Sequence, residues 1–471
     1  MHPDTSKTAP TPSGDDSGVR KPAAASTDDL LTVLTPLFDS AFAPFPHIVL
    51  AVSGGSDSIA LMHLVAAWRR LRAEQRAVGI SIPSVSVVTV DHGLRANSAA
   101  EARKVAGAAA QFGFPHTTLT WVGDKPHSGL QAAARAARYA LIERHVKANN
   151  WQAVATAHTA DDQAETVLMR LARGSGVDGL GAMRGVTALD GGTIVLRPLL
   201  GVRKTALTTY LQEAGIGWDE DPSNGSTDFE RVRIRRALSA LRTSGFELDA
   251  MALGRTATRA ARAADALDRM TAQTWANRQE HARFDPLGYA VVEWAWLTAQ
   301  PEDIRLRLLV GLVDCIGGQG ERVSLGQLEA LTIGRGWRLP AGVTLHDTHW
   351  DNNGHGRLRI FREAGRRSLP TAEVPAPGFA MTWDGRFTIL RCGAGPGLDA
   401  GALEMGPLEA GGLGEIEARG WQRIPVPARV LWSLPTVRAG GSVVAVPPLG
   451  YALLEFAGAF HCDAITPRFA T

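Results

Sequence analysis

Between residues 47 and 218, short apolar runs alternate with longer stretches of helical periodicity, and this alternation constrains the fold more than any other feature. The apolar runs predict strands at 47–52, 85–90, 117–121, 153–157 and 193–196. The helical patterns lie at 58–76, 98–112, 130–149, 161–173 and 203–214. Strands and helices that alternate in this way form βαβ units. We therefore expect an α/β fold with a parallel doubly wound sheet, and ligands beyond the carboxyl ends of its strands.

The 471 residues are enough for about three domains, and the amino-acid composition changes along the chain. Residues 1–28 are rich in Pro, Ser, Thr, Asp and Lys, which predicts a disordered tail. The α/β domain then covers 29–222. Residues 223–335 are rich in Ala, Arg and Leu at helical spacing, so we expect a helical domain there. Residues 336–471 are Gly/Pro-rich with short apolar runs, which predicts a small mixed C-terminal domain.

Composition and charge exclude several classes of protein. No run reaches the ~18 apolar residues of a membrane-spanning helix, and the N-terminus lacks the apolar core of a secretory signal. Cys315, Cys392 and Cys462 form no CxxC pair, so neither a disulfide framework nor a zinc ribbon is expected. We therefore expect a cytoplasmic protein without a membrane partner. The net charge of +2 does not by itself indicate a nucleic-acid partner.

The loop after the first predicted strand reads SGGSDS, from Ser53 through Gly54, Gly55, Ser56 and Asp57 to Ser58. Two glycines let the backbone approach an anion, the hydroxyls donate hydrogen bonds, and the following helix adds free N–H groups. The alternative is a plain turn with an Asp helix cap. It is not a Walker A loop, because the lysine that serves γ-phosphate transfer is missing. The loop resembles the PP-loop of ATP pyrophosphatases, which holds the β,γ-pyrophosphate, and this implies Mg²⁺ at Asp57.

Two further segments follow strands or lie near their ends. Asp91 and His92 come directly after the second predicted strand, where they could contact the adenosine or the substrate, or Asp91 could simply cap the next helix. Arg135 and Arg138 lie three residues apart on one helix face. They could meet a phosphate or a carboxylate, or form a solvated face.

The segment from His158 to Glu165 follows the fourth predicted strand and is strongly acidic. Asp161, Asp162 and Glu165 would cluster in the first turn of a helix, which is more charge than the helix dipole requires. Such a cluster suits an ammonium ligand, a metal ion or a general base, although an acidic helix start facing solvent would look the same. The helix ends at Arg173 in a basic, Gly-rich loop.

Taken together, these segments resemble one family, the tRNA(Ile)-lysidine synthetases. The resemblance rests on SGGSDS and on blocks 90–102, 129–139, 155–183, 197–204 and 218–235, in unbroken order over about 190 residues, and more weakly on 424–437. The family often has a second His after the first in the acidic segment, where this chain has Thr159. A role of that second His cannot be transferred to this chain.

The resemblance implies a PP-loop ATPase of the adenine nucleotide alpha-hydrolase-like fold that acts on tRNA. Members use ATP to adenylate C2 of the wobble cytidine in the CAU anticodon of tRNA(Ile). The ε-amine of L-lysine then displaces AMP, which gives lysidine and changes the codon read from AUG to AUA. The implied cofactors are ATP and Mg²⁺, while a monomer and a homodimer both remain open.

The same resemblance suggests a role for each candidate residue. The loop residues, with Asp91 and His92, bind the nucleotide; Asp57 and Asp162 bind metal. Asp161, Asp162 and Glu165 bind lysine or a second metal, and one of these carboxylates or His158 is the base that deprotonates the lysine amine. The substrate-binding arginines are Arg138, Arg173 and Arg197, which would stabilise phosphate or substrate charge, and Arg231, Arg233 and Arg235, which would grip the tRNA backbone unless they form a solvated helix face.

Three rival functions are weaker. A tRNA thiolase needs cysteines near the nucleotide, whereas all three cysteines of this chain lie after residue 314. A glutamine-dependent amide ligase needs an amidotransferase domain with a nucleophilic Cys. A non-catalytic RNA-binding protein on the same scaffold has no need of an acidic cluster beside phosphates. Release of pyrophosphate from ATP, dependent on tRNA and lysine, would separate an enzyme from a binder.

Overall fold

The computed structural model divides the chain into two compact units, Met1–Ala263 and Ala264–Thr471. It describes residues 27–75, 81–93, 98–123, 125–126, 128–219, 230–246, 248–318, 323, 325–330, 337–339, 343–348, 356–364, 368–393, 403–467 and 469. The expected tail therefore lies outside the described residues except for its last two, which begin a helix.

The first unit is built on a six-stranded sheet with strand order β3-β2-β1-β4-β6-β5. Its strands are β1 (His47–Ala51), β2 (Ser84–Asp91), β3 (His116–Thr120), β4 (Ala153–Ala155), β5 (Val186–Ala188) and β6 (Ile194–Leu196). The five predicted strands are confirmed and pair in parallel. The unpredicted β5 adds an antiparallel edge. Its three residues are too short a run to stand out in the sequence.

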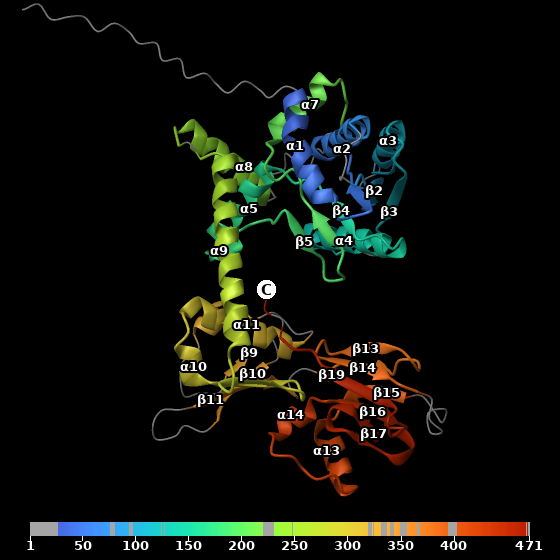
Figure 1. Cartoon of the computed structure of the whole chain (residues 1–471), viewed down its shortest axis with the longest axis vertical. Helices are drawn as coiled ribbons and strands as arrows, with labels where there is room; N and C mark the ends of the chain where they lie inside the picture. The colour runs from blue at the N-terminus through green and yellow to red at the C-terminus, as the bar shows by residue number, and fades with distance from the viewer. Residues whose placement is uncertain are drawn as a thin grey trace, which may run out of the picture. The chain divides into compact units, whose positions relative to one another are not determined.

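Helices cover both faces of this sheet (Figure 1). They are α1 (Thr27–Phe42), α2 (Ser56–Glu74), α3 (Ser98–Gln111), α4 (Leu130–Ala148) and α7 (Lys204–Glu213). The unit also contains α5 (Ala160–Ala172) and α6 (Val177–Leu180). Along β1, Ile48 and Leu50 pack with α1, α2 and α7, whereas Val49 packs with α4 on the other face. Burial on both sides explains why the strands read as continuous apolar runs. The doubly wound architecture is thereby confirmed.

Helix α1 was not predicted, although its apolar residues have helical spacing. Leu30, Leu34, Phe38 and Phe42 recur every fourth position and are buried in the main core of the unit. Pro36 lies inside the helix, which locally disguises the pattern. The helix closes over α2, where the indole nitrogen of Trp68 donates a 2.9 Å hydrogen bond to Asp39.

Two helices extend the first unit beyond the sheet. Helix α8 (Glu230–Thr243) and the first half of α9 (Ala250–Ala276) pack on α5 through a small apolar cluster that includes Val167, Leu238 and Leu253. The predicted helix at 231–242 is therefore present. Its packing against α5 brings arginines of α8 next to the acidic segment.

After the second half of α9, the second unit continues into an antiparallel sheet. Strands β7 (Ala282–Asp285), β8 (Tyr289–Glu293), β9 (Trp337–Leu339), β10 (Val343–Thr348) and β11 (Arg357–Arg362) pair in the order β7-β8-β11-β10-β9. Helices α10 (Trp294–Thr298), α11 (Glu302–Gly317) and α12 (Leu325–Glu329) accompany it. The β7–β8 hairpin interrupts the helical domain expected at 223–335, and the expected 335/336 boundary runs through the sheet. The strand pairing is long-range, so local periodicity could not reveal it.

The C-terminal part of this unit contains two smaller sheets, ordered β12-β15-β16-β17-β18 and β13-β14-β19. Their strands are β12 (Ala372–Glu373), β13 (Ala380–Trp383), β14 (Phe387–Arg391), β15 (Leu403–Pro407), β16 (Pro435–Ala439), β17 (Ser442–Val446), β18 (Tyr451–Ala452) and β19 (Phe460–Ala464). The helices are α13 (Glu409–Ala418) and α14 (Ala428–Trp432), with 3₁₀ turns η2 (Pro447–Leu449) and η3 (Leu454–Phe456). The expected mixed character is confirmed. Within the described parts of the chain, no helix has the length and apolarity needed to cross a bilayer.

Candidate active site

The SGGSDS loop connects β1 to α2 and is braced by its own side chains. Ser58 Oγ accepts a 3.1 Å hydrogen bond from the backbone N–H of Ser53 and donates one of 2.9 Å to the carbonyl of Gly55. Gly54 has φ +93°, a left-handed conformation that favours glycine. Gly55 is the N-cap of α2 and supplies no side-chain cap. A helix start of this kind offers backbone N–H groups and partial positive charge to an anion.

Asp219 and Lys104 flank this loop, although the sequence analysis assigned them no role. The backbone N–H of Asp219 donates a 3.0 Å hydrogen bond to the carbonyl of Gly54. Lys104 Nζ lies 2.5 Å from Asp219 Oδ1. Asp219 belongs to the block at 218–235, so a residue far along the sequence of the domain contacts the phosphate loop.

Asp57 is the partly buried carboxylate at the start of α2. Ser56 Oγ donates to Asp57 Oδ1 at 3.3 Å, and Lys204 Nζ lies 3.3 Å from Asp57 Oδ2. Burial raises the pKa of Asp57; Lys204 opposes this shift and the nearby carboxylate of Asp162 adds to it. The pKa is raised overall, mainly because burial disfavours the charged form, and the attraction of Lys204 does not offset this effect.

The predicted acidic segment begins α5 with a capping box. The Thr159 N–H donates to Asp162 Oδ2 at 2.8 Å, and the Asp162 N–H donates back to Thr159 Oγ1 at 3.3 Å. Asp161 Oδ2 accepts a 2.7 Å hydrogen bond from the backbone N–H of Lys204, the first residue of α7. Both aspartates therefore have structural partners: Asp162 caps α5, and Asp161 joins α5 to the start of α7.

Glu165 lies one turn further along α5 and is only 2% exposed. Arg235 of α8 pairs with it through Nε to Oε1 and through Nη2 to Oε2 at 3.5 Å. Burial lowers the pKa of Arg235, but Glu165 above all, with Asp162 and Asp57, outweighs this and raises it. Arg235 thus faces the acidic cluster rather than forming part of a solvated helix face. The alternative of an acidic helix start in solvent is excluded for Glu165.

His92 is the predicted nucleotide contact with the clearest unmet hydrogen-bonding capacity. Both of its ring nitrogens are buried without a hydrogen-bond partner, and its ring meets Trp121 edge-on at 6.0 Å. Burial lowers its pKa, and Arg138 adds to the shift. Burial and Arg138 thus favour the neutral imidazole, which has one donor and one acceptor for a ligand.

Asp91 has a local structural partner beside His92. The Gly93 N–H donates to Asp91 Oδ1 at 2.8 Å. Hydrogen bonds from Ser98 and Gly93 lower the pKa of Asp91. Ser98 is the first residue of α3, so the alternative that Asp91 braces the start of the next helix is supported.

The remaining predicted residues mainly contact protein groups. Arg197 donates to the carbonyl of Arg184 at 2.9 Å and to Thr187 Oγ1 at 2.8 Å, which fastens the edge strand β5; burial lowers its pKa. Other contacts are Arg173 Nη2 to Glu230 Oε2 at 2.6 Å and His158 Nδ1 to Thr156 Oγ1 at 2.9 Å. Arg233 is exposed, and the side chain of Arg231 lies outside the described residues.

Lys204 is the functional candidate that the sequence analysis missed. It is separated from Asp57 by 147 positions, and nothing in the local pattern of residues 197–204 marks it as part of the loop. The strand order carries the signal, because β6 lies next to β4 and β4 next to β1. Segments that follow these strands meet at one sheet edge.

The fold and this loop define a nucleotide-binding protein of the PP-loop class, and the model of the PP-loop domain matches residues 28–241. A tRNA(Ile)-lysidine synthase of Ruegeria pomeroyi is 38% identical over 430 residues, 90% of this chain and 93% of that relative. The corresponding protein of Bradyrhizobium diazoefficiens is 44% identical over 302 residues, 63% of this chain and 80% of the relative. The chain belongs to the tRNA(Ile)-lysidine synthase family.

Among solved structures, the chain is similar to the U34-tRNA thiolase NcsA from Methanococcus maripaludis. The TM-score is 0.41 and the identity 13%, over 49% of this chain and 80% of that chain.

Proposed function

We propose that this protein uses ATP to join L-lysine to C2 of the wobble cytidine in the CAU anticodon of tRNA(Ile), forming lysidine in the cytoplasm. The observation that carries the proposal is the meeting of an anion-binding loop, Ser53–Ser58, with the carboxylates of Asp57, Asp162 and Glu165. A phosphate cradle suits ATP, and an acidic cluster beside it suits a lysine ammonium.

The chemistry follows in two displacements. The C2 oxygen of cytidine attacks the α-phosphorus of ATP, and the bond to the bridging oxygen breaks with its electron pair remaining on pyrophosphate. The ε-amine of lysine then attacks C2, and AMP leaves with the oxygen. An attacking amine must be neutral, so a carboxylate of the cluster or His158 takes its proton.

The nucleotide contacts divide between loop and histidine. The backbone N–H groups at Gly55 and Ser56 and the hydroxyls of the loop bind the β- and γ-phosphates. The neutral His92 ring offers a donor and an acceptor to the nucleoside part of ATP. The positive charge of Arg138 lowers the pKa of His92, so Arg138 adds positive charge near this ring.

The residues present fit Mg²⁺ at Asp57. Asp57 is a partly buried carboxylate, and the charge of Asp162 adds to the rise in its pKa, so a cation here would offset the repulsion between the two carboxylates. Among the side chains that the structure describes, no group of three or more His, Cys, Asp or Glu residues could hold a metal alone. This suits Mg²⁺, which binds one or two carboxylates together with substrate phosphates and neutralises part of their charge.

The test is mass spectrometry of nucleosides from an unmodified CAU-anticodon tRNA(Ile). The tRNA is incubated with the protein, ATP, Mg²⁺ and L-lysine, and reactions without lysine or without ATP serve as controls. We expect a cytidine that gains the mass of lysine less water. Pyrophosphate release without this product would contradict lysine as the substrate, and absence of both would contradict the enzyme.

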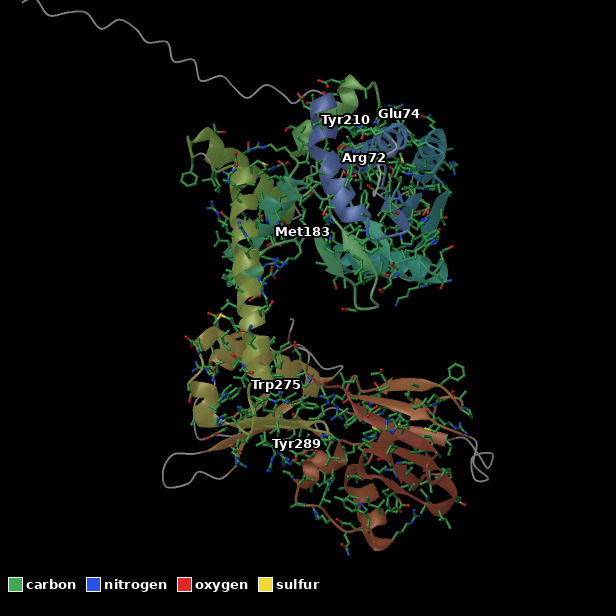
Figure 2. The ribbon with its side chains drawn as sticks, in the orientation of Figure 1. Arg72, Glu74, Met183, Tyr210, Trp275 and Tyr289 are labelled. Atoms are coloured by element: carbon green, nitrogen blue, oxygen red, sulfur yellow. The ribbon has the colours of Figure 1, made fainter. Side chains whose placement is uncertain are left out.

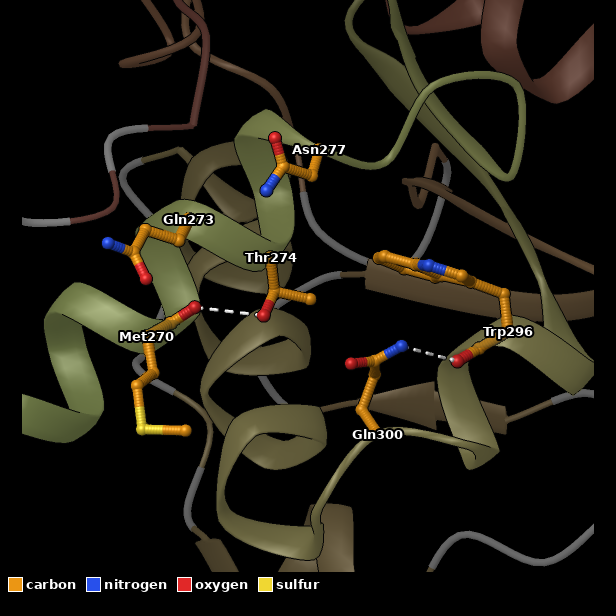
Figure 3. Close-up of a pocket in the computed structure, with 6 residues that line it drawn as sticks. All are labelled: Met270, Gln273, Thr274, Asn277, Trp296 and Gln300. Atoms are coloured by element: carbon orange, nitrogen blue, oxygen red, sulfur yellow. Dashed lines mark hydrogen bonds between the residues drawn. The ribbon is translucent and has the colours of Figure 1, made fainter.

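We also propose that the second unit contacts the tRNA. A pocket of about 340 Å³ is formed by Met270, Gln273, Thr274, Asn277, Trp296 and Gln300 (Figure 3). The Trp296 ring stacks near-parallel to His281, with an interplanar angle of 7°. Gln300 donates to the Trp296 carbonyl at 3.0 Å, which leaves its amide oxygen as an acceptor. An aromatic face beside amides and without charged lining suits an unpaired nucleobase.

Trp296→Ala tests this contact. Loss of one stacked base should weaken tRNA binding about fivefold or more, with unchanged affinity for ATP and for fully paired duplex RNA. Trp421→Ala, in the same unit but outside the pocket, is the control. Unchanged tRNA affinity in Trp296→Ala would exclude the pocket as a base-binding site.

A further inference from the structure

The phosphate loop lacks a lysine in sequence, but the fold places one beside it. Lys204 Nζ lies 3.3 Å from Oδ2 of Asp57, and Asp57 is in the first turn of α2, directly after the loop. A lysine next to a phosphate-binding loop neutralises phosphate charge in other nucleotide-binding folds. The position of Lys204 therefore raises the question of what its ammonium binds during the reaction.

The backbone of Lys204 is held firmly. Its N–H donates to Asp161 Oδ2 at 2.7 Å, and the preceding segment is joined to α5 by a 2.8 Å hydrogen bond from the Ala160 N–H to the Val202 carbonyl. Helix α7 is fastened to α2 by a hydrogen bond between Tyr210 and His63; Figure 2 labels Tyr210 on α7. The Cα of Lys204 is thus fixed relative to the loop.

The Lys204 side chain, in contrast, is partly exposed and can form further hydrogen bonds. Lys204 is 45% exposed, and its ammonium has three N–H donors, of which Asp57 engages one. A lysine serving only to neutralise a buried carboxylate would be expected to lie deeper and to share more hydrogen bonds. The exposed ammonium can instead reach an anion seated on the loop.

We propose that Lys204 binds the β,γ-pyrophosphate of ATP and supplies the positive charge that the loop sequence lacks. When the bond between the α-phosphorus and the bridging oxygen breaks, the electron pair stays on pyrophosphate, and Lys204 stabilises this charge. Asp57 holds the ammonium beside the loop, and Asp161 fixes its backbone. The inference rests on the proposed function for the identity of the reaction, but its binding test does not need tRNA.

The experiment compares Lys204→Met with Lys204→Arg, using Lys147→Met as the matched control. Lys147 is 54% exposed and pairs with Glu143 on α4, away from the loop. Calorimetry measures the affinities for ATP, inorganic pyrophosphate and AMP, each with Mg²⁺. We expect Lys204→Met to weaken ATP and pyrophosphate about tenfold or more and AMP less than twofold. Lys204→Arg should retain part of the affinity, and Lys147→Met all of it.

Thermal unfolding of each variant separates a binding defect from a folding defect. Equal weakening of AMP and pyrophosphate in Lys204→Met would mean that Lys204 only shapes the site, and unchanged pyrophosphate affinity would exclude the contact; either result overturns the inference. If the wild-type protein binds pyrophosphate in a Lys204-dependent way but forms no lysidine, the proposed function fails and the inference about Lys204 stands.

Discussion

Asp57 in the first unit and Asp384 in the second are both withdrawn from solvent but differ in how their charge is compensated. Asp384 is 1% exposed and lies 3.1 Å from Arg362 Nε and 2.8 Å from Arg386 Nε, both also buried. Arg386 donates further to the Ser433 carbonyl at 2.5 Å. Asp57 is 23% exposed and has one half-exposed lysine at 3.3 Å. Asp384 is fully paired by the protein, and Asp57 is not.

The difference separates a structural charge from a functional one. A buried carboxylate with two arginines has its hydrogen-bonding capacity used within the fold, so removing it leaves buried cations without a partner. The Asp384 cluster joins β11 to the β13–β14 hairpin. A carboxylate with a raised pKa and spare capacity instead marks a place where a cation or ligand completes the charge balance. The predictions below test this distinction.

The largest expected effect is that of Asp384→Asn on stability. The substitution removes the charge that two buried arginines share, so we expect the second unit to lose about 3–5 kcal/mol in free energy of unfolding. Urea denaturation measures the loss, and ATP binding by the first unit should persist. Asp463→Asn is the control, because Asp463 is 73% exposed and pairs only with His461. A loss below 1 kcal/mol would remove the distinction between the two carboxylates.

Asp57→Asn should have the opposite profile. We expect pyrophosphate release to fall about 100-fold or more, because an electrostatic group at the reacting phosphates is lost while its shape is kept. The assay is tRNA- and lysine-dependent pyrophosphate release, and circular dichroism should show an intact fold. Asp190→Asn, on the exposed turn before β6, is the control. Near-normal turnover would remove Asp57 from the mechanism.

Glu165 and Arg235 form an intermediate case, a buried carboxylate with one half-exposed arginine. Glu165→Gln and Arg235→Met should each destabilise the first unit, and a double-mutant cycle should give a coupling of about 1 kcal/mol. Chemical denaturation of the four proteins supplies the cycle. Strict additivity of the two single effects would show that the pair does not hold α8 against α5.

The smallest expected effect is on the pH dependence of stability. The pKa of Asp57 is raised by burial, so between the unfolded value of 3.8 and the folded value the native state binds more protons than the unfolded state. The free energy of unfolding therefore falls as pH rises through this window. Asp57→Asn should be more stable than the wild type near pH 7, by about 0.5 kcal/mol. The gain should shrink as the pH falls toward 4, and a gain that grows instead would contradict the raised pKa.

Much of the fold of the first unit could be predicted because its signals are local. Each buried strand is a continuous apolar run, and each helix has a stripe of apolar spacing, as in β1 and α2. The SGGSDS loop is a contiguous motif, and its Gly54 adopts a left-handed backbone conformation with φ +93° that favours glycine. The acidic segment was also recognisable, because three carboxylates fall within five residues.

What could not be predicted depends on long-range contacts. The hairpin β7–β8 pairs with β11 some seventy residues later, so an Ala/Arg-rich segment expected to be helical contributes to a sheet. Arg235 was expected to grip RNA, and its contact with Glu165 arises only because α8 packs on α5. Arg197 was expected at the substrate, and it holds β5, a strand too short to predict.

The sequence by itself determined the doubly wound sheet, the phosphate loop and the identity of the acidic residues, because these depend on local spacing and on residue chemistry. The tertiary structure alone decided which charges are compensated. Lys204 approaches Asp57 across 147 positions, and two arginines close around Asp384. The pKa and the role of a carboxylate depend on burial and on neighbours from distant segments, and those are set only when the chain has folded.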